Sequence, residues 1–257
     1  MNPNRTIGIL GGGQLARMLA IAAADLGFNI NIYCPDIDCP AAQVANKIVF
    51  GDYDDEEKLI DFVKNVDVVT YEFENIGTNA LEELAKIVTI RPSLKALQIS
   101  QDRYTEKIYL NSLNIKTTQF YKIDQVEDIE KLFIRIKKPI LIKTRRLGYD
   151  GKGQALINTQ NDVKKHFRES TLSPSIAEEV IRFEKELSVI IVRDKTGNIK
   201  TFEPGENVHK HGILVTTTIP PSIGEFLKNE AGMISKKNSG RSRLCWSDGS
   251  RVLFKRE

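Results

Sequence analysis

Short apolar segments alternate with helical patterns over the first 90 residues, and this alternation constrains the fold more than any other feature. We expect buried strands at residues 6–10, 29–34 and 66–71. We expect helices at residues 14–27, 55–64 and 78–86. Strands that alternate with helices in this way predict βαβ units on a parallel sheet. Residues 1–100 are therefore predicted to form a parallel-sheet domain.

The pattern changes after residue 100. A polar helix is expected at residues 100–115, where the chain leaves the first domain. Further helices are expected at 124–136 and 160–170, and strands at 139–144, 154–158, 175–181, 186–193 and 199–203. A turn pattern, Thr196-Gly197-Asn198, precedes the last of these strands. This order predicts an α+β domain with an antiparallel sheet.

Composition excludes several classes of protein. The 257 residues are 41% hydrophobic and 28% charged, which is ordinary for a globular protein. Three cysteines predict neither a disulfide framework nor a zinc site. The apolar run at residues 15–28 contains Arg17 and Asp25 and is too polar to span a membrane. Because no signal-peptide pattern is visible, we expect a cytoplasmic protein.

The net charge of +3 comes from the C-terminal tail. Residues 236–257 hold seven of the 37 Lys and Arg residues and two of the 34 Asp and Glu residues. Residues 1–235 therefore have a net charge of −2. A nucleic-acid partner is consequently not expected.

A first glycine cluster follows the first strand and opens a helix. Gly11, Gly13 and Ala16 satisfy the GxGxxG/A spacing, and Asp36 lies about 20 residues further on. This combination is typical of an NAD-dependent oxidoreductase. A glycine-rich turn at a helix N-terminus receives any phosphate, however, so the motif supports phosphate binding more than nicotinamide binding.

A second glycine-rich loop, GYDGKGQ, follows an apolar strand that ends in Lys143. Lysine is a compact cation that binds phosphate, and Gly148, Gly151 and Gly153 let backbone N–H groups approach phosphate oxygens. The Walker spacing GxxxxGK[ST] is absent. The loop therefore predicts a flap over a nucleotide triphosphate, with a glycine-rich hairpin beside a solvated basic strand as the alternative.

Acidic residues follow the third predicted strand. The segment YEFEN places Glu72, Glu74 and Asn75 at the carboxyl end of that strand, where α/β sheets bind ligands. Such groups suit the hydroxyls or amines of a sugar-like substrate. A strand end followed by a helix cap at Asn75 or Thr78 is the structural alternative.

Six motifs taken together resemble one family. They are GGGQLARM at 11–18, YEFENI at 71–76, QDRYTEK at 101–107, KTRRLGYDGKGQ at 143–154, AEEVIRFEKELSVI at 177–190 and ENVHKHGILVTTTIPP at 206–221. In this order they resemble the 5-(carboxyamino)imidazole ribonucleotide synthases, ATP-grasp ligases of purine biosynthesis. The resemblance implies a biotin-carboxylase-like N-terminal domain followed by an α+β ATP-grasp domain. It also implies a homodimer.

The implied reaction uses ATP and Mg²⁺ to activate bicarbonate as carboxyphosphate, which carboxylates 5-aminoimidazole ribonucleotide. Sister purine ATP-grasp ligases, including the formate-dependent transformylase, and a non-catalytic nucleotide-binding remnant are the alternatives. The residues that the resemblance assigns to ATP are Lys107, Lys143, Gly148, Gly151, Lys152, Gly153, Gln154, Glu178, Glu179, Val180 and Glu186. Within this set Glu178 is expected near the adenine edge, and Glu186 is expected at the ribose hydroxyls.

The resemblance assigns further residues to the ribotide and to catalysis. Gly13, Gln14, Leu15, Glu72 and Asn75 are expected to bind the ribotide, and Tyr149, Asp150 and His209 are expected in catalytic roles. His209 and His211 considered alone suit a solvated loop pair. The expected domains are residues 1–100, a small ATP-grasp lobe at 101–183 and the start of a large lobe at 184–235.

The sequence departs from the family after Lys237. It reads NSGRSRLCWSDGSRVLFKRE, without the acidic strands that hold Mg²⁺ in the family, so no metal ligand is assigned. Reverse translation of residues 236–257 with A- or T-ending codons, read one base later, gives KKIVEEVDYVGVMVVEFYLKE, which resembles the missing strand. We therefore expect a frameshift near Lys237, a disordered out-of-frame tail at 236–257 and an inactive chain.

Overall fold

The computed structural model describes residues 4–148, 152–167, 173–242 and 248–254. The chain divides into two units, Met1–Gln98 and Ile99–Glu257, which are described separately. Within the described residues, no helix has the length and apolar character that crossing a membrane requires.

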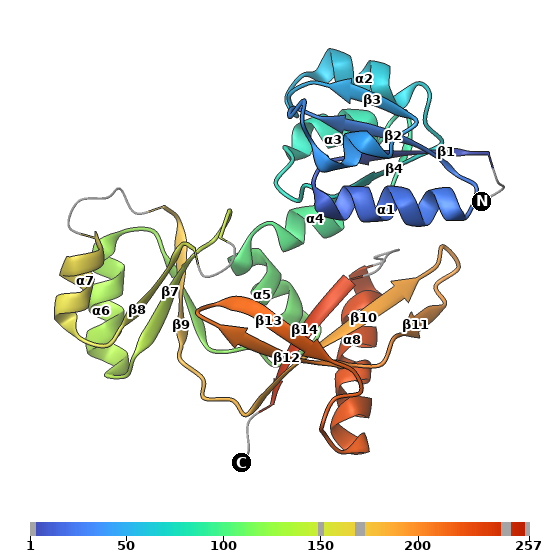
Figure 1. Cartoon of the computed structure of the whole chain (residues 1–257). Helices are drawn as coiled ribbons and strands as arrows, with labels where there is room; N and C mark the ends of the chain where they lie inside the picture. The colour runs from blue at the N-terminus through green and yellow to red at the C-terminus, as the bar shows by residue number, and fades with distance from the viewer. Residues whose placement is uncertain (1–3, 149–151, 168–172, 243–247, 255–257) are drawn as a thin grey trace. The chain divides into compact units, whose positions relative to one another are not determined.

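A five-stranded parallel sheet forms the centre of the first unit (Figure 1). Its order is β3-β2-β1-β4-β5. The strands are β1 (Thr6–Leu10), β2 (Asn29–Cys34), β3 (Lys47–Phe50), β4 (Val68–Tyr71) and β5 (Thr89–Ile90). Because parallel strands end at the same edge, the loops after β1 and β4 are neighbours: Ile7–Leu10 pair with Val68–Tyr71.

Helices cover both faces of this sheet, as expected for parallel strands buried on two sides. They are α1 (Gln14–Asp25), the 3₁₀ turn η1 (Pro40–Gln43), α2 (Glu56–Val63), α3 (Thr78–Leu84) and α4 (Leu94–Ser100). Ala16 and Ala20 of α1 pack with Ile9 in one apolar cluster. Leu59 of α2 and Leu81 of α3 pack in a second cluster. In Figure 1, α1 and α2 lie on opposite sides of the sheet.

The second unit begins with α5 (Arg103–Ser112) and a four-stranded antiparallel sheet in the order β6-β9-β7-β8. The strands are β6 (Phe120–Ile123), β7 (Ile140–Thr144), β8 (Gln154–Ile157) and β9 (Ser175–Glu179). Helices α6 (Val126–Ile136) and α7 (Gln160–Phe167) pack on it through Ile129, Leu132 and Val163. Strands β7 and β8 flank the second glycine-rich loop.

A second antiparallel sheet follows in the order β11-β10-β12-β13, and β14 also pairs with β10. Its strands are β10 (Lys185–Arg193), β11 (Ile199–Thr201), β12 (Gly205–Lys210), β13 (Ile213–Thr218) and β14 (Asp248–Phe254). Helix α8 (Glu225–Ser242) packs on this sheet, where Ala231 contacts the cluster that contains Leu187 and Val189.

The predicted fold class is confirmed: a parallel-sheet domain precedes an α+β region with antiparallel sheets. The sequence analysis did not predict β3, β5, β6, β12 or β13. Strand β5 has only two residues, and all six residues of β13 are exposed, so neither has the apolar pattern of a buried strand.

The C-terminal segment requires a correction. We expected disorder and no strand in residues 236–257, whereas residues 236–242 continue α8 and residues 248–254 form β14. Strand β14 pairs antiparallel with Lys185–Ile191 of β10. The backbone groups along that edge of β10 can pair with a strand of any sequence. The apolar periodicity of the tail alone therefore does not predict that the tail pairs with β10.

Candidate functional site

The predicted site residues fall into two groups, one in each unit. In the first unit, the first glycine loop (Gly11–Gly13) joins β1 to α1 and contacts the carboxylate of Glu72. The backbone N–H of Glu72 donates to the Leu10 carbonyl at 2.8 Å, which fixes the residue beside the loop. A Cβ added to Gly11 would lie 2.5 Å from Oε2 of Glu72, and one added to Gly13 would lie 2.6 Å from Oε1. Only glycine lets the loop approach the carboxylate this closely.

Burial raises the pKa of Glu72 above its ordinary value. The Gly13 N–H, which donates to the carboxylate, opposes this shift, and the nearby charge of Glu74 adds to it. Glu72 is therefore a partly desolvated carboxylate that accepts a hydrogen bond from the first glycine loop. Such a group can accept hydrogen bonds from the hydroxyls or the amine of a ligand.

The other predicted ribotide residues surround the same loop. Gln14 and Leu15 form the first turn of α1, and both are exposed. Asn75 lies half-buried in the segment after β4. The structure thus places Gly13, Gln14, Leu15, Glu72 and Asn75 on the loops that follow β1 and β4. These loops lie at one edge of the sheet because β1 and β4 are adjacent and parallel.

In the second unit, a buried carboxylate lies between two lysines. Nζ of Lys143 is 3.0 Å from Oε2 of Glu178, and Nζ of Lys107 is 3.3 Å from Oε1. Lys107 comes from α5, Lys143 from β7 and Glu178 from β9. Thr118 donates its hydroxyl to Oε2 of Glu178 at 3.2 Å and accepts from Lys107 at 3.0 Å.

The charges of this cluster shift one another's pKa values. Burial alone would raise the pKa of Glu178, but Lys143 and Lys107 outweigh it and hold the pKa below its ordinary value. The pKa of Lys107 is lowered, mainly by burial and further by the charge of Lys143, although Glu178 opposes the shift. One carboxylate thus faces two cations, and the cluster retains an excess of positive charge that suits an anionic ligand.

The second glycine-rich loop starts directly after the lysine of β7. The Thr144 N–H donates to the Gly153 carbonyl at 2.8 Å and Lys143 is paired with Gln154, so the described ends of the loop are held together. Gly153 has a φ of +71°, a conformation that favours glycine. Gly148 and Lys152 border the part outside the described residues, which contains the predicted site residues Tyr149, Asp150 and Gly151.

Glu186 of β10 faces two side chains of β12. Its Oε1 accepts from Nδ2 of Asn207 at 3.3 Å and lies 3.5 Å from Nδ1 of His209. The prediction that His209 and His211 form a solvated pair is therefore incomplete, because His209 contacts Glu186 whereas His211 is exposed. Glu179 ends β9, and Val180 is exposed directly after it.

Two domain families match the chain. Residues 4–101 match the ribonucleotide synthetase preATP-grasp domain, and residues 108–241 match the ATP-grasp domain. An N5-carboxyaminoimidazole ribonucleotide synthase from Brucella melitensis is 44% identical over 225 residues, which cover 87% of this chain and 62% of the relative. The N5-carboxyaminoimidazole synthetase of Staphylococcus aureus, solved with ADP, is 34% identical with a TM-score of 0.93. The match covers 98% of this chain and 67% of the Staphylococcus aureus chain.

The chain belongs to the N5-carboxyaminoimidazole ribonucleotide synthase family. A family member from Aspergillus clavatus, solved with ADP and 5-aminoimidazole ribonucleotide, is 25% identical with a TM-score of 0.87 and covers 99% of this chain and 70% of its own. The chain spans about 62% of the length of the Brucella melitensis relative. The first glycine loop belongs to the preATP-grasp domain, so the alternative of an NAD-dependent oxidoreductase is not supported.

Sequence reasoning missed residues of the synthase fold that hold the second glycine-rich loop. Arg145 makes two bonds to Asp102, from Nε to Oδ1 at 3.0 Å and from Nη2 to Oδ2 at 2.6 Å. Arg103 donates from Nη2 to the Gly148 carbonyl at 2.8 Å. The only available signal was an aspartate before the polar helix, which is a typical N-cap. For Arg145 and Arg146 the sequence left two interpretations open, a solvated charge pair or a part of the loop that attracts anions.

The carboxylate of Glu178 contacts Lys107 and Lys143. Its expected place near the adenine edge stays a prediction. The family also implies Mg²⁺. Among the described residues, no group of three or more His, Cys, Asp or Glu side chains could hold a metal ion.

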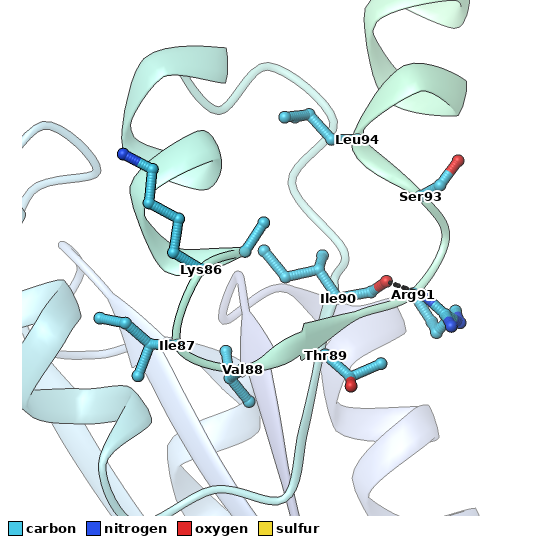
Figure 2. Close-up of a pocket in the computed structure, with 9 residues that line it drawn as sticks. Lys86, Ile87, Val88, Thr89, Ile90, Arg91, Ser93 and Leu94 are labelled. Carbon is cyan, nitrogen blue, oxygen red and sulfur yellow. Dashed lines mark hydrogen bonds between the residues drawn. The ribbon is translucent and has the colours of Figure 1, made fainter.

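A hollow of about 480 Å³ lies along β5, lined by residues 85–91, 93 and 94 (Figure 2). Figure 2 shows Arg91 turned back to the Ile90 carbonyl, to which its Nη1 donates at 2.9 Å. None of the predicted site residues of the synthase family lines this hollow.

Proposed function

We propose that this chain has the fold of an ATP-dependent ligase that carboxylates 5-aminoimidazole ribonucleotide with bicarbonate, in purine biosynthesis. The observation that carries the proposal is the cluster of Lys107, Glu178 and Lys143 at the base of a glycine-rich loop. Lys143 and Glu178 lie within residues 108–241, which match the ATP-grasp domain, and Lys107 directly precedes that range. A homodimer and a cytoplasmic location are further proposals that rest on the family.

ATP would be held by residues of the second unit. Lys107 and Lys143 would bind phosphate oxygens, with Gly148, Gly151, Lys152, Gly153 and Gln154 in the loop that covers them. The backbone of Glu179 and Val180 would contact the adenine, and Glu178 would keep the two lysines in position. Glu186 would accept hydrogen bonds from both ribose hydroxyls, because one carboxylate can accept two at once.

The ribotide would be bound by residues of the first unit, and three further residues are proposed for catalysis. Gly13, Gln14, Leu15, Glu72 and Asn75 would bind it, and Tyr149, Asp150 and His209 would act in catalysis. The contact of His209 with Glu186 supports a place for this histidine near the nucleotide ribose. The position of the Glu72 carboxylate against the first glycine loop supports its role as an acceptor for the ribotide.

The reaction needs no protein nucleophile. A bicarbonate oxygen attacks the γ-phosphorus of ATP and ADP leaves, which forms carboxyphosphate. The amine nitrogen of the ribotide then attacks the carboxyl carbon, phosphate leaves and the nitrogen loses a proton. Lys107 and Lys143 would stabilise the negative charge on the transferring group, and the closed loop would exclude water from the intermediate.

A non-catalytic nucleotide-binding remnant is the second candidate. It rests on the departure from the family motifs that the sequence shows after Lys237. The frameshift near Lys237 stays a proposal. The chain as given would then bind ATP and turn over none.

Calorimetry with ATP and with 5-aminoimidazole ribonucleotide tests the proposal, on this chain and on a version with the shifted frame restored. We expect both chains to bind ATP, and only the restored chain to hydrolyse ATP in response to the ribotide. Lys143→Met should abolish ATP binding, whereas Lys122→Met, on β6 of the same sheet, should not. A wild-type chain that binds no ATP would refute the proposal, and turnover by the 257-residue chain would refute its inactivity.

A further inference from the structure

A partly buried ion pair links the start of α5 to the base of the second glycine-rich loop. The guanidinium of Arg145 makes the two bonds of 3.0 and 2.6 Å to the carboxylate of Asp102 described above. Asp102 is 6% exposed. Two parallel hydrogen bonds fix the orientation of both groups as well as their distance.

Each partner of the pair is itself held in place. Asp102 caps α5 by accepting from the Tyr104 N–H at 2.9 Å and the Thr105 N–H at 3.2 Å. The guanidinium carbon of Arg145 lies 5.4 Å from the ring centre of Tyr104, within cation–π range. The backbone N–H of Arg145 donates to the Pro174 carbonyl at 2.9 Å.

A second link runs between the same two elements. The N–H of Arg103 donates to the Arg145 carbonyl at 3.0 Å, and its side chain donates to the Gly148 carbonyl. The first residue of α5 therefore contacts the loop at two points on the chain. These contacts leave the segment from Arg145 to Gly148 fixed on α5.

The pair also joins the two elements that carry the lysines proposed to bind phosphate. Lys107 lies on α5, four residues after Arg103, and Lys143 lies on β7, two residues before Arg145. A movement of α5 along β7 would change the distance between the two amines. Glu178 contacts both lysines. Its carboxylate alone therefore does not fix the position of either amine.

We propose that Arg145 and Asp102 are positioning residues that hold the second glycine-rich loop on α5 and thereby place Lys107 and Lys143 for a triphosphate. This proposal rests on the proposed ATP binding. Arg146, the next residue, is exposed, forms only a long ion pair of 3.9 Å with Asp102 and donates to Gln101 at 3.4 Å. It therefore offers a control with the same charge that lacks the two short bonds to Asp102.

Three variants in the full chain test the pair: Arg145→Met, Arg145→Lys and Asp102→Asn, with Arg146→Met as control. The asparagine side chain retains an oxygen that can cap α5, so Asp102→Asn removes the ion pair while the helix start is preserved. Circular dichroism checks folding. Calorimetry measures the affinity for ATP and for AMP, which lacks the β- and γ-phosphates. Hydrogen exchange measures protection of the amides of residues 144–148.

We expect Arg145→Met to weaken ATP binding by about tenfold or more, because small displacements of positioning groups are costly. Affinity for AMP should not change. Arg145→Lys should restore ATP affinity only in part, since lysine cannot form two parallel bonds. Arg145→Met combined with Asp102→Asn should lose no more than Arg145→Met alone, because the two residues act as one unit. Protection of residues 144–148 should fall in these variants and not in Arg146→Met.

Equal losses of ATP and AMP affinity, additive losses in the double variant, or protection that matches Arg146→Met would overturn the proposal. If the wild-type chain binds no ATP, the proposed function fails. The exchange measurement still decides the positioning role, because it requires no nucleotide.

Discussion

At the scale of single residues, two carboxylates of this protein show how the surroundings determine the pKa of an acidic side chain. Glu178 and Glu72 are both withdrawn from water, yet their pKa values shift in opposite directions. Glu178 faces two lysines, whose charges outweigh the effect of burial. Glu72 has a backbone N–H as its compensating partner, and burial prevails. The first acid stabilises the fold when ionised, and the second costs stability when ionised.

Glu178→Gln should destabilise the second unit by about 3 kcal/mol, because it leaves two neighbouring lysines without their shared counter-charge. The lowered pKa of Glu178 means that its contribution is present above the pKa in the unfolded chain and is lost as the pH falls through the folded value. The loss on acidification should therefore be smaller in the variant. Urea unfolding followed by circular dichroism at several pH values measures this. Glu179→Gln, at the next residue, is the control, and equal effects of both changes would contradict the prediction.

Glu72→Gln should stabilise the first unit at pH 7. The raised pKa of Glu72 means that the ionised form is disfavoured in the folded state, so stability is lost as the pH rises through the folded value. The gain from the variant should shrink as the pH is lowered. Thermal unfolding at several pH values measures the stabilisation and its dependence on pH. Asp54→Asn, at an exposed residue, is the control. If Glu72→Gln lowers the melting temperature at pH 7, the assigned cost of the buried charge is wrong. A binding site that costs the fold some stability is a common outcome in proteins.

At the scale of elements, the conformation of each glycine-rich loop depends on the groups that its glycines approach. Gly11 has a φ of +123° and approaches both the Glu72 carboxylate and the Phe73 backbone. Gly153 has positive φ and lies against Thr144. In both loops the glycine permits close approach of the backbone to the group that ends a neighbouring strand.

Gly11→Ala should destabilise the first unit by more than about 1 kcal/mol, since alanine is strained at this φ and its Cβ would collide with Glu72. Gly77→Ala is the matched control, because a Cβ at Gly77 meets nothing within 4 Å. Denaturant unfolding compares the two variants. Similar free energies of unfolding for both would show that the loop adapts and that the strain is absent.

At the scale of the whole molecule, β10 joins segments that are distant in the sequence. It pairs with β11, β12 and β14, and it carries α8 on one face through Leu187 and Val189. Strand β14 comes from the segment in which the sequence predicted no structure. A sheet edge accepts a strand through backbone groups, which every residue except proline provides.

Deletion of residues 243–257 should cause self-association, because it leaves the backbone of Lys185–Ile191 without its partner β14. Deletion of residues 255–257 retains β14 and should leave the protein unchanged. Light scattering of the purified proteins at increasing concentration measures the difference. If both deletions behave alike, β14 does not protect this edge in solution.

Much of the fold was predictable because its signals are local. Strands β1, β2 and β4 are apolar segments between amphipathic helices, and their predicted positions are confirmed. Strand β12 escaped prediction because its sequence, GENVHK, holds a single apolar residue, and β13 because its sequence, ILVTTT, does not alternate. The glycine loops were recognised from spacing alone, whereas the pairing of Arg145 with Asp102 was not, because it joins residues 43 positions apart.

The sequence by itself determined the alternation of strands and helices, the two glycine-rich loops and the family, since each depends on residues close together in the chain. Only the tertiary structure decided that Glu178 lies between Lys107 and Lys143 and that Asp102 holds Arg145. These contacts depend on which strands pair and how α5 packs on β7. Burial then determines whether each charge is stabilised or penalised, and burial is a property of the folded chain.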